Sequence, residues 1–411
     1  MMSRLLNCLL SAAVVTCCSA AAYAEDIEVL HYWTSGGESK AVAVLKQMIE
    51  KQGYTWKDSA VAGGGGANAM TVLKSRVVAG TPPAAVQMRG PVVQEWARMG
   101  VLAPIDAVTG NWAKELAPDV NAALMEGGHY YAAPHWIHRT NWLWINKIAL
   151  DKVGGSPPTN WDEFFALADR LKAAGYVAIA HGETPYEDGY LFQNTVLSMG
   201  ADFFRKAILE HDQATLTSPT MVRVFDILRK MQDYFDSGQT GRAWNMSVRM
   251  LITDKAGMFF MGDWAKGEFS AANKKPNQDY VCANVPGTAG YFAYIVDGFV
   301  FFRQNGGDAT KGQLAMAADI LNPAYQKVAA AYKGAIPANI TVPVDGFDAC
   351  AQKSAADLKA ASSSNTLVAS MNQGVDEARL GAIIEVVNKF MNSDQDSESA
   401  VKALAAASKA M

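Results

Sequence analysis

The chain lacks an excess of positive charge and has a single long apolar stretch. Its 411 residues include 36 lysines and arginines against 40 aspartates and glutamates, a net charge of −4. A chain with this balance has no general electrostatic footprint for nucleic acid. The apolar stretch, Leu5 to about Cys18, lies at the N-terminus, which excludes a membrane protein with several spans. The length predicts about two to three domains.

The first 24 residues have the pattern of a secretory signal peptide. Arg4 precedes the apolar stretch, and the segment ends in Ala22-Tyr23-Ala24, an A-x-A cleavage pattern. We predict cleavage after Ala24 and a secreted mature chain that begins at Glu25. The alternative is an uncleaved membrane anchor, although the apolar stretch is short for a span.

Cysteine is scarce in the mature chain. Of five cysteines, Cys8, Cys17 and Cys18 fall within the signal peptide, so Cys282 and Cys350 remain. One pair suits an oxidising compartment, and we predict a disulfide that contributes roughly 4–5 kcal/mol of stability. Two unrelated buried thiols are the alternative.

Motifs of catalysis and cofactor binding are also lacking. The sequence has no P-loop, no H-E-x-x-H and no G-x-S-x-G, so we expect no cofactor. His129, His135 and His138 lie close in sequence between aromatic residues, where hydrogen-bonding or packing roles are expected rather than a metal site. The glycine run 63–66 predicts a close-approach loop that opens a helix.

Several charged residues are expected to be structural. Asp263 follows a turn glycine and is predicted to cap backbone N–H groups. Arg139 is predicted to pair with a buried carboxylate rather than with a ligand. Glu187 and Asp188 lie near two glycines and are expected in a solvated loop.

Strand-like and helix-like segments alternate along the mature chain, which predicts an α/β fold with largely parallel sheets. Two lobes joined by several crossovers fit the absence of a long linker. The crossovers are expected at residues 130–140 and at the strand around Asp297. Strands are predicted at residues 27–33, 83–88, 142–145, 176–180, 256–261 and 291–302, and helices at 161–174, 221–235, 380–390 and 400–411.

Aromatic residues at predicted strand ends are the main binding signal. Tyr32 and Trp33 end the first strand and lead into Thr34-Ser35-Gly36-Gly37-Glu38, and Trp264 follows Gly262-Asp263. In open α/β sheets, ligands bind at the carboxyl ends of strands, although each tryptophan could equally be a core residue. Aromatic faces beside carboxylates and amines suit a sugar, because rings cover its C–H faces and charged groups pair with its hydroxyls.

Five stretches give the chain a resemblance to a known family. They are residues 32–38 (YWTSGGE), 137–144 (IHRTNWLW), 161–165 (WDEFF), 255–265 (KAGMFFMGDWA) and 332–337 (YKGAIP). The chain resembles the extracellular sugar-binding proteins of bacterial ABC transporters, in particular the glucose- and mannose-type subgroup. The resemblance implies a periplasmic binding protein fold, in which two mostly parallel-sheet lobes close around a hinge.

The resemblance also implies roles for individual residues. Trp33 and Trp264 would stack on the sugar, Glu38 and Asp297 would accept hydroxyl protons, and Lys333 would donate. Arg89 and Gln373 stand where the subgroup carries lysine and histidine, and both changes alter the set of donors. The predicted ligand-binding residues are therefore Tyr32, Trp33, Glu38, Arg89, His138, Trp264, Asp297, Lys333 and Gln373.

The expected division of the chain is a signal peptide (1–24), an N-terminal lobe (25–135 plus about 300–328) and a C-terminal lobe (136–299 plus about 329–411). The expected function is that of a monomeric, non-catalytic periplasmic receptor. It would deliver a monosaccharide, glucose or a related aldohexose, to an ABC-transporter permease. One alternative is a disaccharide or sugar derivative, admitted by Arg89 and Gln373. The other is a secreted glycoside hydrolase that draws on Glu38, Asp263, Glu268 and Asp297.

Overall fold

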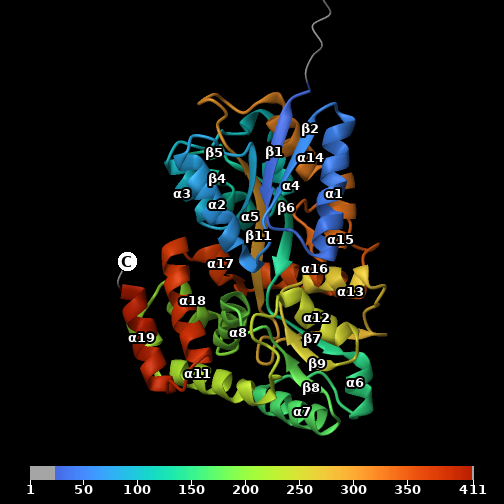
Figure 1. Ribbon diagram of the computed structural model, residues 1–411, viewed down its shortest axis with the longest axis vertical. Helices are drawn as coiled ribbons and strands as arrows, with labels where there is room; N and C mark the ends of the chain where they lie inside the picture. Colours follow the sequence, from blue (N-terminus) through green and yellow to red (C-terminus); the bar gives the residue numbers. More distant parts are fainter. Residues whose placement is uncertain (1–23, 410–411) are drawn as a thin grey trace, which may run out of the picture.

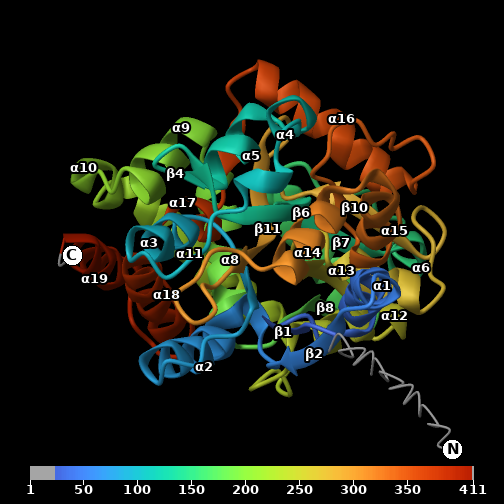
Figure 2. The same ribbon diagram turned by 90° about the horizontal axis from the view of Figure 1, so that it is seen from above.

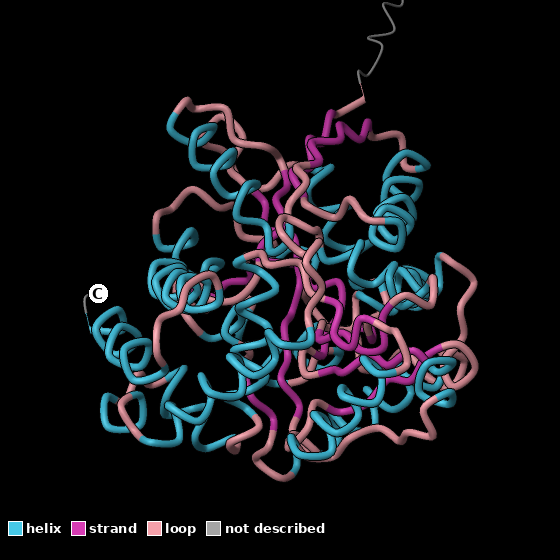
Figure 3. The backbone as a smooth tube through the Cα atoms, turned by 60° about the horizontal axis from the view of Figure 1, so that its bottom comes forward, coloured by secondary structure: helices cyan, strands magenta, loops and turns pink. Residues whose placement is uncertain are grey.

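The computed structural model describes residues 24–409. The predicted signal peptide lies outside this range except for Ala24, as do Cys8, Cys17 and Cys18. The described chain forms two lobes, each with its own sheet, stacked along the long axis of the molecule (Figure 1). Most strands lie in the interior and the helices surround them (Figure 3).

The first lobe is built on a seven-stranded sheet in the order β12-β6-β11-β3-β1-β2, with β13 also paired to β11. Its central strands β6 and β11 are buried along their whole length apart from Tyr294. The strands are β1 (Asp26–His31), β2 (Thr55–Ala60), β3 (Ala85–Met88), β6 (Ala132–Arg139), β11 (Phe292–Phe301), β12 (Ile336–Pro337) and β13 (Leu367–Ala369).

The second lobe contains a four-stranded sheet in the order β10-β7-β9-β8. A separate hairpin of β4 (Met125–Glu126) and β5 (His129–Tyr130) belongs to neither sheet. The strands of the second sheet are β7 (Trp142–Asn146), β8 (Val177–Ala180), β9 (Ala256–Phe260) and β10 (Tyr280–Asn284).

The α/β class and the two lobes are confirmed, but both sheets are mixed rather than mostly parallel. β1 is parallel to β2 and β3, whereas β11 is antiparallel to both β3 and β6. In the second sheet β7 is antiparallel to both of its neighbours, and only the β8–β9 pair is parallel. β7 and β11 explain part of the difference, because β7 enters its sheet directly from β6 and β11 enters from β10, each from the other lobe instead of through a helix of the same lobe.

Helices surround both sheets. In the first lobe α1, α14 and α15 pack together beside β1 (Figure 2), and none of the helices within residues 24–409 is long and apolar enough to cross a membrane. The helices of the first lobe are α1 (Gly36–Lys51), α2 (Ala67–Val78), α3 (Val92–Arg98), α4 (Trp112–Glu115), α5 (Pro118–Ala123), α14 (Lys311–Leu321) and α15 (Pro323–Lys333). Those of the second are α6 (Lys147–Lys152), α7 (Trp161–Ala173), α8 (Pro185–Leu197), α9 (Ala201–Phe204), α10 (Gln213–Leu216), α11 (Pro219–Met231), α12 (Trp244–Ile252), α13 (Ala265–Ala271), α17 (Met371–Gly374), α18 (Glu377–Met391) and α19 (Ser397–Lys409).

Crossovers between the lobes lie where the sequence predicts them. β6 of the larger sheet continues directly into β7 of the smaller one, and β10 leads into β11. The pairing of β11 with β6 shifts register between Asp297 and Gly298. Such an irregularity can re-aim a side chain next to a binding site.

The first core extends beyond the predicted boundary near residue 328. Ala329, Ala330 and Ile336 pack into it, and so do Ala351 and Ala361 of α16 (Ala349–Ser363). Periodicity identifies these apolar faces, but it does not say which of two cores each face joins. Residues 136–139 of β6 and 292–299 of β11, expected in the C-terminal lobe, also lie in the sheet of the first lobe.

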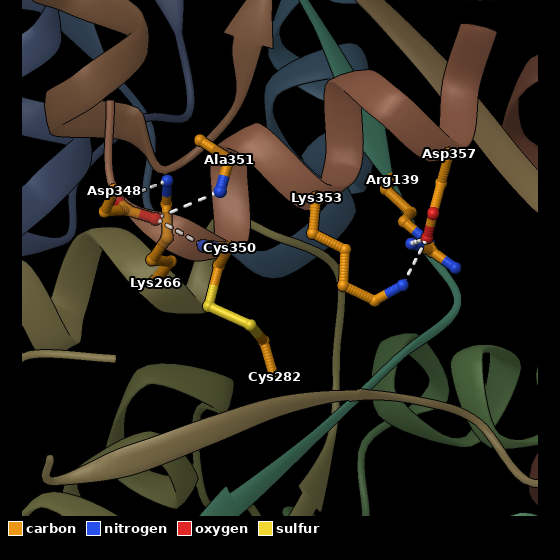
Figure 4. Close-up of a disulfide and its surroundings, with 8 residues drawn as sticks. All are labelled: Arg139, Lys266, Cys282, Asp348, Cys350, Ala351, Lys353 and Asp357. Carbon is orange, nitrogen blue, oxygen red and sulfur yellow. Dashed lines mark hydrogen bonds and ion pairs between the residues drawn. A yellow bond between two sulfur atoms is a disulfide. The ribbon is translucent and has the colours of Figure 1, made fainter. Parts of the chain in front are cut away.

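The predicted disulfide is present and ties α16 to the second lobe. Cys350 of α16 is bonded to Cys282 of β10, with a Cα–Cα distance of 6.0 Å (Figure 4). Near it, the Nζ atom of Lys266 lies 2.7 Å from Asp348. One helix therefore packs on the first core while it is bonded covalently to the second sheet.

Candidate functional site

A cavity of about 260 Å³ lies between the lobes. It is formed by the segment after β1, the glycine loop before α2, the first turns of α8 and α12, Trp264, the facing strands β6 and β11, and the end of α15. Of the nine predicted ligand-binding residues, Gln373 is the one that does not line it. The lining includes Tyr32, Trp33, Glu38, Arg89, His138, Trp264, Asp297 and Lys333.

The N-terminus of α1 carries a buried ion pair. Glu38 is in the first turn of the helix, where its Oε2 accepts the backbone N–H of Ser35 at 3.2 Å. Its Oε1 accepts from Lys333 Nζ at 2.6 Å. The ammonium group lies 5.7 Å from the centre of the Trp33 ring and 5.8 Å from that of Trp264. The lysine is thus held as a donor between two aromatic faces.

A closely packed glycine lets this helix approach the second lobe. A Cβ atom on Gly37 would lie 2.8 Å from the backbone of Gly267 and 2.9 Å from the carbonyl oxygen of Tyr332. The Gly37 N–H donates to Glu268 on α13 at 2.9 Å. Residue 37 therefore has to be glycine for the lobes to meet at this edge of the cavity.

The buried imidazole of His138 lies between two carboxylates. His138 Nδ1 is hydrogen-bonded to Asp263, and its Nε2 lies 3.4 Å from Asp297. Burial opposes the charge of His138, but the two carboxylates outweigh it and raise its pKa. Burial likewise opposes the charge of Asp297, but His138, Arg89 and Lys333 lower its pKa. Asp297 is therefore a carboxylate, an acceptor-only group facing the cavity.

Asp263 binds a backbone N–H, as predicted, and Arg139 pairs with a carboxylate that is half-buried instead of buried. Asp263 also accepts the backbone N–H of Arg139 at 2.9 Å. The guanidinium of Arg139 is buried and pairs with Asp357 at 2.5 Å, and its Cζ atom lies 4.1 Å from the centre of the Trp142 ring. Neither residue lines the cavity.

Trp33 and Trp264 both line the cavity, but they pack against different parts of the protein. Trp264 projects from the second lobe, with its ring 5.3 Å from that of Tyr190 and 6.4 Å from that of Tyr186. Trp33 packs edge-on against His135 and is 2% exposed, so it is both a core residue and part of the cavity wall.

Gln373 takes a structural position instead of a ligand-binding one. Its Oε1 accepts the backbone N–H of Val296 at 2.9 Å. Its neighbour Asn372 accepts from Arg89 at 3.0 Å. Neither Gln373 nor Asn372 lines the cavity.

The sequence matches the family described as bacterial extracellular solute-binding protein over residues 34–305, more than half of the chain. The chain belongs to this family. Relatives and structural neighbours are solute receptors, so the protein is a binding protein and not an enzyme, and the predicted resemblance is confirmed.

Relatives and solved structures cover nearly the whole chain. A probable sugar-binding periplasmic protein of Brucella suis is 47% identical over 387 residues, 93% of this chain and 92% of the relative. One from Rhizobium meliloti is 44% identical over 400 residues, 96% of each. The solute receptor AcbH, described as having an exclusive preference for β-D-galactopyranose, has a TM-score of 0.79 at 20% identity over 94% of this chain and 98% of its own. A chitin oligosaccharide binding protein has a TM-score of 0.77 at 18% identity, with the same coverage.

Sequence reasoning missed part of this binding protein's cavity wall. Tyr186, Tyr190, Trp244 and Asn245 line it, together with glycines 63–65. The signal for the tyrosines was present, because Thr184-Pro185 is a helix start and residues four apart share a helix face. The glycine run is a close-approach loop opening a helix, as predicted. No cluster of three or more His, Cys, Asp and Glu within residues 24–409 is arranged to hold a metal.

The expectation of a solvated loop at Glu187 and Asp188 is wrong. Both are buried in α8 of the binding protein, directly after the cavity residue Tyr186. His181 Nε2 lies 2.8 Å from Asp188, and Asn388 donates to the other oxygen of that carboxylate at 2.6 Å. The flanking glycines suggested a loop, whereas Thr184 caps a helix whose first turn is covered by α18.

Glu187→Gln should stabilise the protein at alkaline pH. Burial raises the pKa of Glu187 from 4.5 to about 7, so the folded state binds a proton that the unfolded state has released. The free energy of unfolding therefore falls as pH rises from 4.5 to 7. At pH 8 the neutral amide should raise it by about 1–3 kcal/mol relative to wild type. Urea unfolding at pH 5 and pH 8 measures this, with the exposed Glu50→Gln as control. Equal effects at both pH values would contradict the expectation.

Proposed function

We propose that this protein is a periplasmic receptor that captures one monosaccharide, glucose or another aldohexose, and delivers it to an ABC-transporter permease. One observation carries the proposal. A small interlobe cavity combines two tryptophans with the Lys333–Glu38 pair and the Asp297 carboxylate. At about 260 Å³ it is smaller than the roughly 300–1,000 Å³ typical of drug-sized ligands, which suits a single sugar ring.

The cavity chemistry matches a sugar on each side. Trp264 and Trp33 offer apolar faces, Asp297 accepts hydroxyl protons and Lys333 donates. Charged partners also discriminate between epimers, because a misplaced hydroxyl leaves a buried charge unpaired. Since these groups come from both lobes, the sugar would favour the closed arrangement by population shift.

Delivery and location are part of the same proposal. The relatives from Brucella suis and Rhizobium meliloti bear the name of probable sugar-binding periplasmic proteins. We extend that role to this chain, with export through the predicted signal peptide, a membrane permease as partner and a monomeric state in solution.

A disaccharide or a sugar derivative is the second candidate. It is favoured by a larger space of about 580 Å³ that shares Tyr32, Arg89 and Tyr186 with the sugar cavity. A disaccharide in the sugar cavity would have to pass these three side chains to place its second ring in the larger space.

Titration calorimetry on residues 25–411, freed of any carried ligand, tests the proposal. Glucose, galactose, mannose, xylose and several disaccharides form the panel. We expect one-to-one binding of one monosaccharide at micromolar or tighter affinity, about −8 kcal/mol or better. Folded protein that binds no monosaccharide of the panel would overturn it.

Trp264→Ala should weaken sugar binding at least tenfold, about 1.4 kcal/mol, because it removes an aromatic face from the cavity wall. Trp33→Ala should do the same but also destabilise the fold, since its ring packs in the first core. Trp264→Phe, which keeps a ring, is the matched control and should retain most of the affinity. Unchanged affinity in both alanine variants would remove these residues from the site.

A further inference from the structure

A second space lies beside the sugar cavity, on the other side of Arg89. This apolar chamber measures about 580 Å³ and lies between α2 and α3 of the first lobe and α8 and α18 of the second. Its walls are mostly apolar and include Met70, Met88, Val92, Val375, Leu380 and Ile384.

Arg89 belongs to the walls of both spaces. Its guanidinium donates to the hydroxyl of Tyr32, to the carbonyl of Gly65 at 2.7 Å and to Oδ1 of Asn372 at 3.0 Å. These bonds connect the loops of the first lobe to α17 of the second. The side chain is thus fixed across the boundary between cavity and chamber instead of pointing freely into either.

Tyr186 of the second lobe also lines both spaces, as do glycines 63–65, Ala243 and Trp244. A Cβ atom on Gly65, whose φ is +74°, would lie 2.8 Å from the Tyr186 ring. The glycine loop and the ring are therefore in contact with no room for a side chain between them. We call Tyr32, Arg89 and Tyr186 the partition.

The chamber suits an apolar group better than a second sugar ring. Each hydroxyl of a second ring would need a hydrogen-bonding partner, since a buried unpaired polar group costs about 1–3 kcal/mol. Apolar side chains form most of the chamber wall, and the polar ones that reach it are Asn68, Gln87, Arg89, Thr184, Asn372 and Glu377 together with the tyrosine hydroxyls. An aryl or alkyl substituent on a sugar could bury its surface there without such a cost.

We propose that Arg89 is a specificity residue that limits the site to one unsubstituted sugar ring. Its hydrogen bonds keep the partition closed, and its removal joins the sugar cavity to the apolar chamber. The truncated protein then accepts a sugar that carries an apolar group. This inference rests on the proposed monosaccharide site.

The test compares substituted and free sugar in each variant. The probes are the monosaccharide that wild type binds, its α- and β-phenyl glycosides and its mono-O-benzyl ethers, so that a substituent leaves the ring in every direction. We expect wild type to bind every substituted sugar at least tenfold more weakly than the free one. In Arg89→Ala that ratio should shrink at least tenfold for one or more probes, even where affinity for the free sugar also falls.

Filling the chamber provides the control. Gly381 of α18 lines it, and a Cβ atom there would meet nothing within 4 Å. Gly381→Leu added to Arg89→Ala should restore the wild-type ratio, whereas Gly381→Leu alone should leave free-sugar affinity unchanged. Tyr186→Ala, which opens the partition from the other lobe, is measured in parallel in case Arg89→Ala fails to fold.

Two results would overturn the inference. One is wild-type protein that binds a substituted sugar as tightly as the free sugar. The other is a ratio of substituted-sugar to free-sugar affinity that stays at the wild-type value in both Arg89→Ala and Tyr186→Ala. Wild-type protein that binds no monosaccharide at all would instead overturn the proposed function, on which the inference rests.

Discussion

Asp297→Ala should lower the affinity for the bound sugar by about 2–5 kcal/mol, or roughly 30- to 5,000-fold, the usual cost of truncating a buried, hydrogen-bonded charge at an interface. Two acidic side chains line the cavity, Glu38 and Asp297. Both oxygens of Glu38 have partners, in Ser35 and Lys333. Asp297 is kept ionised and is the carboxylate left to accept sugar hydroxyls.

The effect on affinity can be separated from an effect on folding. Asp297→Asn keeps the volume and one acceptor oxygen, so its loss should be smaller than that of alanine. Titration calorimetry gives the affinities, and thermal unfolding without sugar shows whether each variant is folded. A folded Asp297→Ala protein whose affinity stays within threefold of wild type would contradict the assignment.

Much of this cavity is encoded in local sequence. Tyr32 and Trp33 directly follow β1, and Trp264 follows β9 after the three residues 261–263. Because strand ends meet at the same side of a lobe, local patterns were enough to predict that these residues, far apart in the chain, belong to one site. The family resemblance named Glu38 and Lys333 as separate sugar-binding residues, but it did not predict that they pair with each other across 295 positions.

What escaped prediction depends on packing between distant segments. Glycines beside Glu187 and Asp188 indicated a loop, and nothing local shows that α18 covers them. Gln373 faces β11 instead of the cavity, because its amide meets the backbone of Val296. The antiparallel pairing of β11 also escaped prediction, since a strand's hydrophobicity does not reveal whether its neighbours run parallel to it.

Replacing Cys282 and Cys350 together by serine should lower the free energy of unfolding by about 4 kcal/mol. The two residues are 68 positions apart, and in the chain-entropy view a loop of that size is a large restriction on the unfolded state. The bond also joins α16, which packs on the first core, to β10 of the second sheet (Figure 4). Urea unfolding with and without reductant measures the effect, and reductant should change wild type but not the double variant.

The double serine variant also shows whether the disulfide affects sugar binding as well as stability. Neither cysteine lines the sugar cavity, and the ion pairs of Lys266 with Asp348 and of Arg139 with Asp357 still hold α16 near its place. At a temperature where the double variant is fully folded, its sugar affinity should therefore stay within about threefold of wild type, a difference below ~0.7 kcal/mol. A large loss of affinity in folded protein would mean that the disulfide also sets the relative position of the lobes. In that case α16 would be part of the closure that the sugar induces, and not only a covalent brace for it.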